Sequence, residues 1–293
     1  MKPIAHRSEL RSRRLVLLSC LVLAALPGCA MKNWVRHRNH EAHSQVFTKT
    51  ATLDEITDHL NQERSRVMGW RSTDVRIKAT GEGIIAPSLS ASICVQSPRN
   101  LRLMASSPLG TEVDFGSNTD RFWFWAKRQE PKILMTGSHE GLGQQQVLPI
   151  PFPPAWLMEA LGVVPLDTTG VRMEPDETTA ARVRLISATS DGGRAAKRVM
   201  VVDLSRGQVI EHALYDEADN LVASAAMSDF RQEANGVTLP HHIELNWPET
   251  KSVLKLQIGK VDVNPKIDAQ TWKLPSYPNY EVVDLDRATQ RRR

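Results

Sequence analysis

Three groups of side chains in this 293-residue chain have types that could bind a metal ion or catalyse hydrolysis. The segment His139–Gly143 holds a His-Glu pair but lacks the second histidine of a zinc protease helix. His241 and His242 are neighbours in an alternating segment, so their side chains point to opposite faces and cannot readily chelate one metal ion. The acidic turn 216–220 lacks the glycine and terminal glutamate of a calcium loop, and no Gly-x-Ser-x-Gly motif occurs. We therefore expect no catalytic residue, no metal site and no cofactor.

One cysteine stands where lipid attachment is the expected chemistry. An apolar run begins at Leu15, behind the basic stretch 11–14, and closes with Leu26-Pro27-Gly28-Cys29. The run is too short for a bilayer, which takes about 20 apolar residues, but it fits an export signal. Its end resembles the lipobox of bacterial lipoproteins. That resemblance implies a signal peptide over 1–28, with Cys29 as the lipidated first residue of the mature protein.

Two alternatives concern the same segment. The stretch Ser12-Arg13-Arg14 also resembles a twin-arginine export signal, and Cys29 could instead be an unmodified cysteine in a plain signal peptide or short anchor helix. After it, the polar, His-rich residues up to 50 suit a tether, so that 29–50 form the lipid anchor and tether.

The formal charge of +4 belongs entirely to the expected signal. Five basic side chains and one acid lie within 1–28, namely Lys2, Arg7, Arg11, Arg13, Arg14 and Glu9. Their removal leaves a neutral chain with evenly scattered charges, so we expect no nucleic-acid partner. Of the three cysteines, Cys20 leaves with the signal and Cys29 takes lipid, so Cys94 remains alone and no internal disulfide is expected.

The rest of the chain changes from a helical period to a period of two. Thr52 and Glu55 form a capping-box pattern before apolar residues at near-helical spacing up to Val67, and a second, short helix is expected over 155–161. Strands are expected over 75–79, 89–95, 101–105, 113–115, 121–127, 132–136, 182–187, 198–204, 209–215, 221–230, 237–247 and 252–261. The aromatic strand 121–127 leaves open which of its faces points inward.

About a dozen strands with two or three helices exceed what a simple sandwich needs. A sheet that curls without closing, with helices covering its open side, accounts for the pattern and leaves an apolar cavity. We expect this single domain over 51–284 and a disordered tail over 285–293.

Two stretches carry a family resemblance: 100–113, with a Ser-Ser-Pro-Leu-Gly turn between two strands, and 148–162, with Pro-Ile-Pro before a Trp-containing helix. Both resemble the outer-membrane lipoprotein receptor LolB and its distant relative, the carrier LolA. The segment 236–240 and the alternating strands after it resemble the last strands of these proteins. The resemblance covers about residues 53–263, and it implies an incomplete, unclosed antiparallel β-barrel capped by helices, whose apolar interior holds acyl chains.

Candidate site residues follow from the alternation and from this resemblance. The residues expected to line a lipid-binding cavity are Leu89, Ala91, Ile93, Leu101, Leu103, Val113, Phe115, Ile133 and Met135, with Trp156 and Leu157 of the short helix over the opening. Leu109 resembles the protruding apolar loop of the receptor, and the alternative is that it folds back onto its own sheet.

The expected function is therefore that of a lipid-anchored envelope protein that binds lipid or lipoprotein acyl chains, in lipoprotein localisation. Its expected partners are the membrane, through lipidated Cys29, and a periplasmic LolA-like carrier. Ala30 follows Cys29, and the absence of Asp there points to the outer membrane, facing the periplasm. The alternative is a structural or regulatory lipoprotein that uses the same fold, with a filled core, to contact another protein; a periplasmic hydrolase comes third.

Overall fold

The computed structural model describes residues 45–81, 84–85, 87–139, 154–189 and 197–290. Residues 44–293 form one compact unit. The expected signal peptide, Cys29 and most of the tether lie outside the described residues. Among the residues that are described, no helix is both long and apolar enough to cross a membrane.

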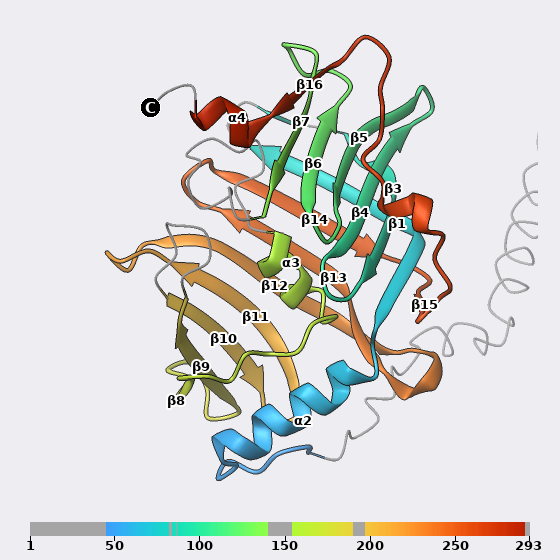
Figure 1. Ribbon diagram of the computed structural model, residues 1–293. Coiled ribbons are helices and arrows are strands. Elements are labelled where there is room, and N and C mark those ends of the chain that lie inside the picture. Colours follow the sequence, from blue (N-terminus) through green and yellow to red (C-terminus); the bar gives the residue numbers. More distant parts are fainter. Residues whose placement is uncertain (1–44, 82–83, 86, 140–153, 190–196, 291–293) are drawn as a thin grey trace, which may run out of the picture. The chain divides into compact units, whose positions relative to one another are not determined.

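Within the described residues, sixteen strands form one sheet with the order β16-β7-β6-β5-β4-β3-β1-β14-β13-β12-β11-β10-β9-β8 (Figure 1), and β2 and β15 both pair with β1. The strands are β1 (Gly69–Gly81), β2 (Ile84–Ile85), β3 (Leu89–Gln96), β4 (Asn100–Ser107), β5 (Gly110–Ser117), β6 (Arg121–Ala126), β7 (Ile133–Ser138), β8 (Arg172–Pro175), β9 (Arg182–Ala188), β10 (Lys197–Asp203), β11 (Gln208–Tyr215), β12 (Leu221–Gln232), β13 (Thr238–Trp247), β14 (Ser252–Ile258), β15 (Asp262–Val263) and β16 (Glu281–Asp284).

The sheet does not close on itself. β16 and β8 stand at the two ends of the strand order, and no pairing joins them within the described residues. All neighbours are antiparallel except β16, which pairs parallel with β7. The mainly β, unclosed fold predicted from the sequence is confirmed, and the sheet is mixed rather than wholly antiparallel because the C-terminal strand adds to β7.

The inner face, defined as the face that carries the main apolar cluster, is built from cross-strand rows. One row runs from Ile93 to Leu103, Phe115, Phe124 and Met135 across five successive strands. Residues directly opposite each other in an antiparallel pair share a face, so the period of two places this whole row on one side. The first three are buried in the main cluster and Phe124 packs against it.

Helix α2 (Leu53–Ser65) covers part of the inner face. It begins with the predicted capping box, in which the Thr52 N–H donates to Glu55 Oε2 at 2.8 Å and the Glu55 N–H donates to Thr52 Oγ1 at 3.3 Å. Ile56 and Leu60 are buried in the main apolar cluster, so the helix packs through its apolar stripe.

Helix α3 (Pro154–Ala160) covers another part of the same face (Figure 1). Trp156, Leu157 and Leu161 are all buried in the main cluster. The indole N–H of Trp70 on β1 donates to the Leu161 carbonyl at 3.2 Å, which fixes the end of the helix to the sheet.

The outer face of β4–β7 is covered by residues 264–290, here called the C-terminal segment. It contains a 3₁₀ turn (Ala269–Trp272), β16 and helix α4 (Leu285–Gln290). Tyr277 stacks on Trp125 with ring centroids 3.8 Å apart and an interplanar angle of 5°, and Tyr280 OH donates to the Lys127 carbonyl at 2.7 Å. Residues 285–290, expected to be disordered, form α4 instead, and Asp286 of this helix accepts a hydrogen bond from the Ser138 N–H of β7 at 2.9 Å.

Strand β6 divides its aromatic side chains between the two faces. Phe124 joins the inner cluster, whereas Trp123 and Trp125 point outward and are nonetheless buried, because Tyr277 and Tyr280 of the C-terminal segment cover them. The question that the sequence left open at this strand is answered by a segment far away in the chain.

A buried carboxylate ties the C-terminal segment to the sheet. Asp114 is fully buried and forms an ion pair with Arg102 at 2.6 Å, while Tyr277 OH and the Trp123 indole N–H also donate to it. Gly116 lies beside this group, and a Cβ atom there would stand 2.1 Å from the Trp123 ring, so only glycine fits.

We predict that Asp114→Ala lowers the free energy of unfolding by about 3–5 kcal/mol, because it leaves the partly buried Arg102 without its carboxylate. Tyr277→Phe, which removes only one donor, should cost about 1 kcal/mol. Urea unfolding of residues 44–293 measures both values. Equal, small losses for the two variants would show that the carboxylate does not hold this face together.

Candidate functional site

A cleft opens between helix α2 and strands β11, β12 and β13. It has about 520 Å³ of empty volume, counting the part open to solvent. Its lining residues come from α2 and the segment after it, α3 and the turn after it, β11, β12, and β13 with the residue before it: Leu60, Glu63, Arg64, Val67, Ala160, Gly162, Gln208, Val209, His212, Met227, Phe230, Val237, Thr238, Leu239 and Pro240. Most of these are apolar, with a few polar side chains among them, which is typical of small-molecule sites.

His212 is the most unusual member of this lining. It is fully buried, and neither ring nitrogen has a hydrogen-bond partner among the described residues. On β11 it pairs with Met200 and Ala225, both buried in the main cluster. Burial, and then the charges of Arg64 and Arg198, hold the pKa of His212 well below its usual value, so the imidazole is neutral at pH 7.

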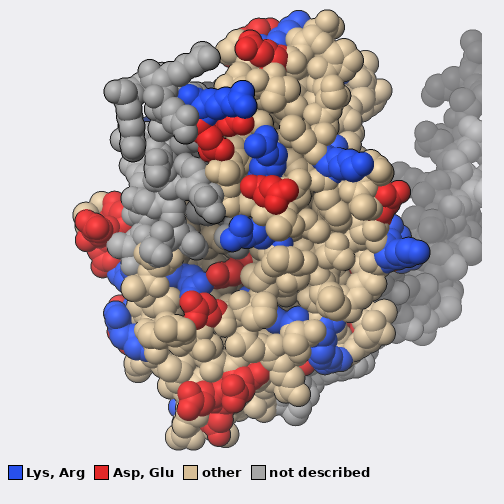
Figure 2. Space-filling view, viewed as in Figure 1, with Lys and Arg blue, Asp and Glu red and all other residues tan. Residues whose placement is uncertain are grey.

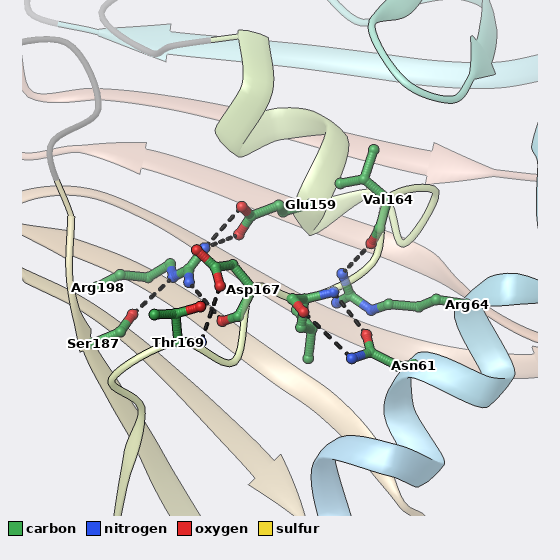
Figure 3. Close-up of polar contacts among 9 residues, drawn as sticks. Asn61, Arg64, Glu159, Val164, Asp167, Thr169, Ser187 and Arg198 are labelled. Carbon is green, nitrogen blue, oxygen red and sulfur yellow. Dashed lines mark hydrogen bonds and ion pairs between the residues drawn. The ribbon is translucent and has the colours of Figure 1, made fainter.

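Polar contacts beside the cleft hold helix α3 in place (Figure 3). Arg198 of β10 is buried, and its Nη1 donates to both carboxylate oxygens of Glu159 on α3, at 2.6 and 2.7 Å. Arg198 also donates to Ser187 Oγ at 3.2 Å and to the Asp167 carbonyl at 3.3 Å. The guanidinium therefore joins the sheet, the helix and the segment after the helix.

Helix α2 holds that same segment from the other side (Figure 3). Arg64 Nη1 donates to the Val164 carbonyl at 2.9 Å, and the Asn61 side chain exchanges two hydrogen bonds with the backbone of Leu166, at 2.7 and 3.3 Å. Burial lowers the pKa of Arg64 to about 10, the Glu159 charge opposing this and the Arg198 charge adding to it, so Arg64 remains a cation at pH 7.

The structure brings most of the predicted cavity residues together, but not at this cleft. Leu89, Ala91, Ile93, Leu101, Leu103, Val113, Phe115, Trp156 and Leu157 belong to or pack against the main apolar cluster. Met135 is buried and Ile133 half-buried, two residues apart on β7 and therefore on the same face. None of these side chains lines the cleft under α2, so a lining role for them stays a prediction.

Leu109 stands in the turn between β4 and β5 and is 76% exposed. Its side chain therefore does not fold back onto the sheet. The apolar tip at this turn is a structural fact, and its role stays a prediction.

Other residues weighed for chemistry have structural contacts. His241 is buried and its ring nitrogens lie 2.8 Å from the Ile258 carbonyl and 2.6 Å from Glu233 Oε1. His242, on the same strand, is only half-buried, consistent with opposite faces. Among the described residues, no group of three or more His, Cys, Asp or Glu side chains is placed to hold a metal ion. Cys94 is a free thiol.

The face drawn in Figure 2 shows Lys and Arg interspersed with Asp and Glu, without a large field of one sign.

The polar residues of the cleft were missed in the reading of the sequence. A histidine in an otherwise apolar alternating strand, at His212, is the one signal that could have drawn attention to the inner face there. Arg64 lies in the last turn of α2, where basic residues are common and ordinarily exposed to solvent, so its residue type did not indicate a buried site.

Comparisons with known proteins identify the fold. No protein-family model matches the chain, and the curated proteins give no sequence match. A domain assigned to outer membrane lipoprotein sorting from Vibrio parahaemolyticus is similar at a TM-score of 0.53 and 10% identity, over 74% of this chain and 95% of that one. A LolA superfamily protein from Nitrosomonas europaea is similar at a TM-score of 0.51 and 12% identity, over 76% and 98%. A DUF1329 family protein from Desulfovibrio piger has a TM-score of 0.53 and 9% identity, over 78% and 98%.

At these identities the likeness shows the fold. The chain has the LolA-like fold, and the likeness to the LolA and LolB superfamily predicted from the sequence is confirmed at that level.

We predict that His212 makes the protein less stable in mild acid. The unfolded imidazole takes up a proton near pH 6.5 while the folded one does not, so the free energy of unfolding falls below that pH by up to about 1.4 kcal/mol per pH unit. His212→Leu removes this contribution, so urea unfolding should show the variant gaining stability over the wild type between about pH 7.5 and about pH 5.5. Parallel stability curves would contradict the prediction.

Proposed function

We propose that the protein is a lipid-anchored envelope protein that binds the acyl chains of lipids or lipoproteins in the interior of its unclosed sheet, in lipoprotein localisation to the outer membrane. The observation that carries this proposal is the cleft with mostly apolar walls, whose buried members Leu60, Val209 and Leu239 belong to the main inner cluster. An acyl chain entering there would reach the inner face of a fold shared with a lipoprotein-sorting domain and a LolA superfamily protein.

Such a function requires apolar surface that shields an acyl chain from water. Removing an acyl chain from water is worth about 0.8 kcal/mol per CH₂ group, so a carrier needs apolar surface and no reactive group. Lipid-modified Cys29, the tether 29–50 and the domain 51–284 would place this surface near a membrane, with a periplasmic LolA-like carrier as the partner that delivers the chain.

A second candidate is a structural or regulatory lipoprotein that uses the fold to contact another protein. The close burial of Leu101 and Trp156 favours it, since these two side chains of the cavity expected from the sequence are 0–1% exposed. The two candidates differ in whether the cleft accepts an apolar ligand.

The first prediction concerns the anchor. Cys29→Ser should leave the precursor uncleaved by the lipoprotein signal peptidase and unlabelled by a fatty-acid probe, because no thiol remains to carry lipid. Gel mobility and probe labelling in cells measure this. Normal processing and labelling of the variant would rule out the anchor.

The second prediction concerns the cleft. Glu63→Trp places a large ring on a half-buried residue of the α2 wall, so binding of the neutral fluorophore N-phenyl-1-naphthylamine to residues 44–293 should weaken by about tenfold with little change in melting temperature. Gln62→Trp is the control, since Gln62 is the exposed neighbour on the same helix and does not line the cleft. Absence of probe binding in the wild type would favour the structural candidate.

The third prediction concerns Leu109. Because its side chain is exposed, Leu109→Glu should change the free energy of unfolding by no more than about 0.5 kcal/mol. Transfer of bound fluorophore from residues 44–293 to phospholipid vesicles should nevertheless slow severalfold, since a charged tip no longer inserts into lipid. Unchanged transfer would eliminate the role of this turn in delivery.

A further inference from the structure

The inner face of the C-terminal half of the sheet carries one polar side chain in a row of apolar ones. The row runs from Leu185 to Met200, His212, Ala225 and Leu245 on five neighbouring strands. The four flanking residues are buried in the main cluster. His212 therefore holds an N–H donor and a free acceptor in an apolar interior; the residue lines the cleft, and both ring nitrogens are closed to solvent. An unpartnered polar group in such a place costs stability, so its presence needs another explanation.

Two arginines act on His212, and they differ in their ion pairs. Arg64 lines the cleft, and Arg198, which is outside the lining, is paired with Glu159 at 2.6 Å. Arg64 donates to a backbone carbonyl, and no carboxylate among the described residues forms an ion pair with it. Glu63, the acidic residue of the cleft lining, forms an ion pair with Arg66 at 3.0 Å. Among the described residues Arg64 thus has no ion-pair partner of its own, and it shares the charge of Glu159 with Arg198.

We propose that this cleft binds the carboxylate of a long-chain fatty acid, with Arg64 and His212 as hydrogen-bond donors to its two oxygens, an assignment that rests on the acyl-binding function proposed above. The alkyl chain lies along the apolar wall formed by Val209, Met227 and Leu239, which leads into the main cluster. The cleft then recognises both ends of an amphipathic acid, its charge and its chain.

The number of donors favours a carboxylate over a lipid phosphate. A neutral His212 donates once, and Arg64 has N–H groups beyond the one bound to Val164. These suffice for the two oxygens of a monoanion. A phosphate monoester would bring more charge and a third oxygen to the same two side chains.

Ligand competition against bound N-phenyl-1-naphthylamine tests this on residues 44–293, which form a compact unit with its own apolar core. The ligands are palmitate, methyl palmitate and palmitoyl lysophosphatidic acid, which share one acyl chain and differ at the polar end. Palmitate should bind about 10- to 100-fold more tightly than methyl palmitate, as expected for charge-assisted hydrogen bonds.

Two variants remove the two donors. Arg64→Gln and His212→Leu should each bring palmitate binding close to that of methyl palmitate and leave methyl palmitate binding unchanged. His212→Leu is the decisive one, because replacing an unpartnered imidazole by an apolar side chain should leave stability unchanged or raised while affinity falls, an outcome that a purely structural role would not give. Arg76→Gln is the control, since it removes the same charge from an exposed position on β1 outside the cleft.

Each alternative outcome has a separate meaning. Equal binding of palmitate and methyl palmitate would overturn the carboxylate assignment while the acyl-binding function stands. Preference for palmitate that survives both variants would overturn the assignment to Arg64 and His212, and stronger binding of the lysophosphatidic acid would replace the carboxylate by a phosphate. Failure of all three ligands and of the fluorophore to bind would overturn the proposed function itself.

Discussion

An unclosed sheet has an apolar inner face that it cannot cover by itself, and the rest of this structure depends on how that face is covered. In a closed barrel, opposite walls would bury each other. Here α2 and α3 take that place, with Ile56 and Trp156 at 0–1% exposure. Where the two helices do not meet the sheet closely, the cleft between α2 and β11–β13 remains. The candidate site therefore results from incomplete closure and needs no separate element.

Covering an inner face with short helices requires anchors, and those of this protein are charged. Helix α3 contributes few residues, so its position depends on the Arg198–Glu159 pair as well as on packing. A buried ion pair seldom adds net stability over apolar residues, but it is costly to break once formed, and it fixes one arrangement among several apolar ones. Arg102 and Asp114 do the same for the C-terminal segment on the outer face. The two edge strands of the sheet are short: β8 ends at Pro175, and β16 is followed directly by α4. Short edge strands offer little backbone for pairing with another chain.

The local elements could be predicted from the sequence because their signals are local. Alternation of apolar residues marks the strands of both halves, and the Thr52–Glu55 capping box marks the start of α2. The parallel addition of β16 and the covered tryptophans of β6 could not be predicted in this way. Tyr277 meets Trp125 across a long stretch of chain, and no pattern within β6 says what will lie on its outer face. The tail was interpreted as disordered for the same reason, since its polar composition hides a contact between Asp286 and β7.

The candidate site shows even more clearly than the fold what a local sequence pattern cannot predict. A period of two tells which side chains face inward, but not whether the space between them is empty. Ala91 and Phe115 do face inward as expected, yet the helix expected to stand over an opening is itself buried against the cluster that contains them. The cleft instead lies between α2 and β11, at His212. The alternation of its strand predicts that His212 points inward, but the sequence does not show that its side chain has no hydrogen-bond partner. Partners are decided by tertiary packing, so an unpartnered buried group is information that only the structure supplies, and it points to the ligand rather than to the fold.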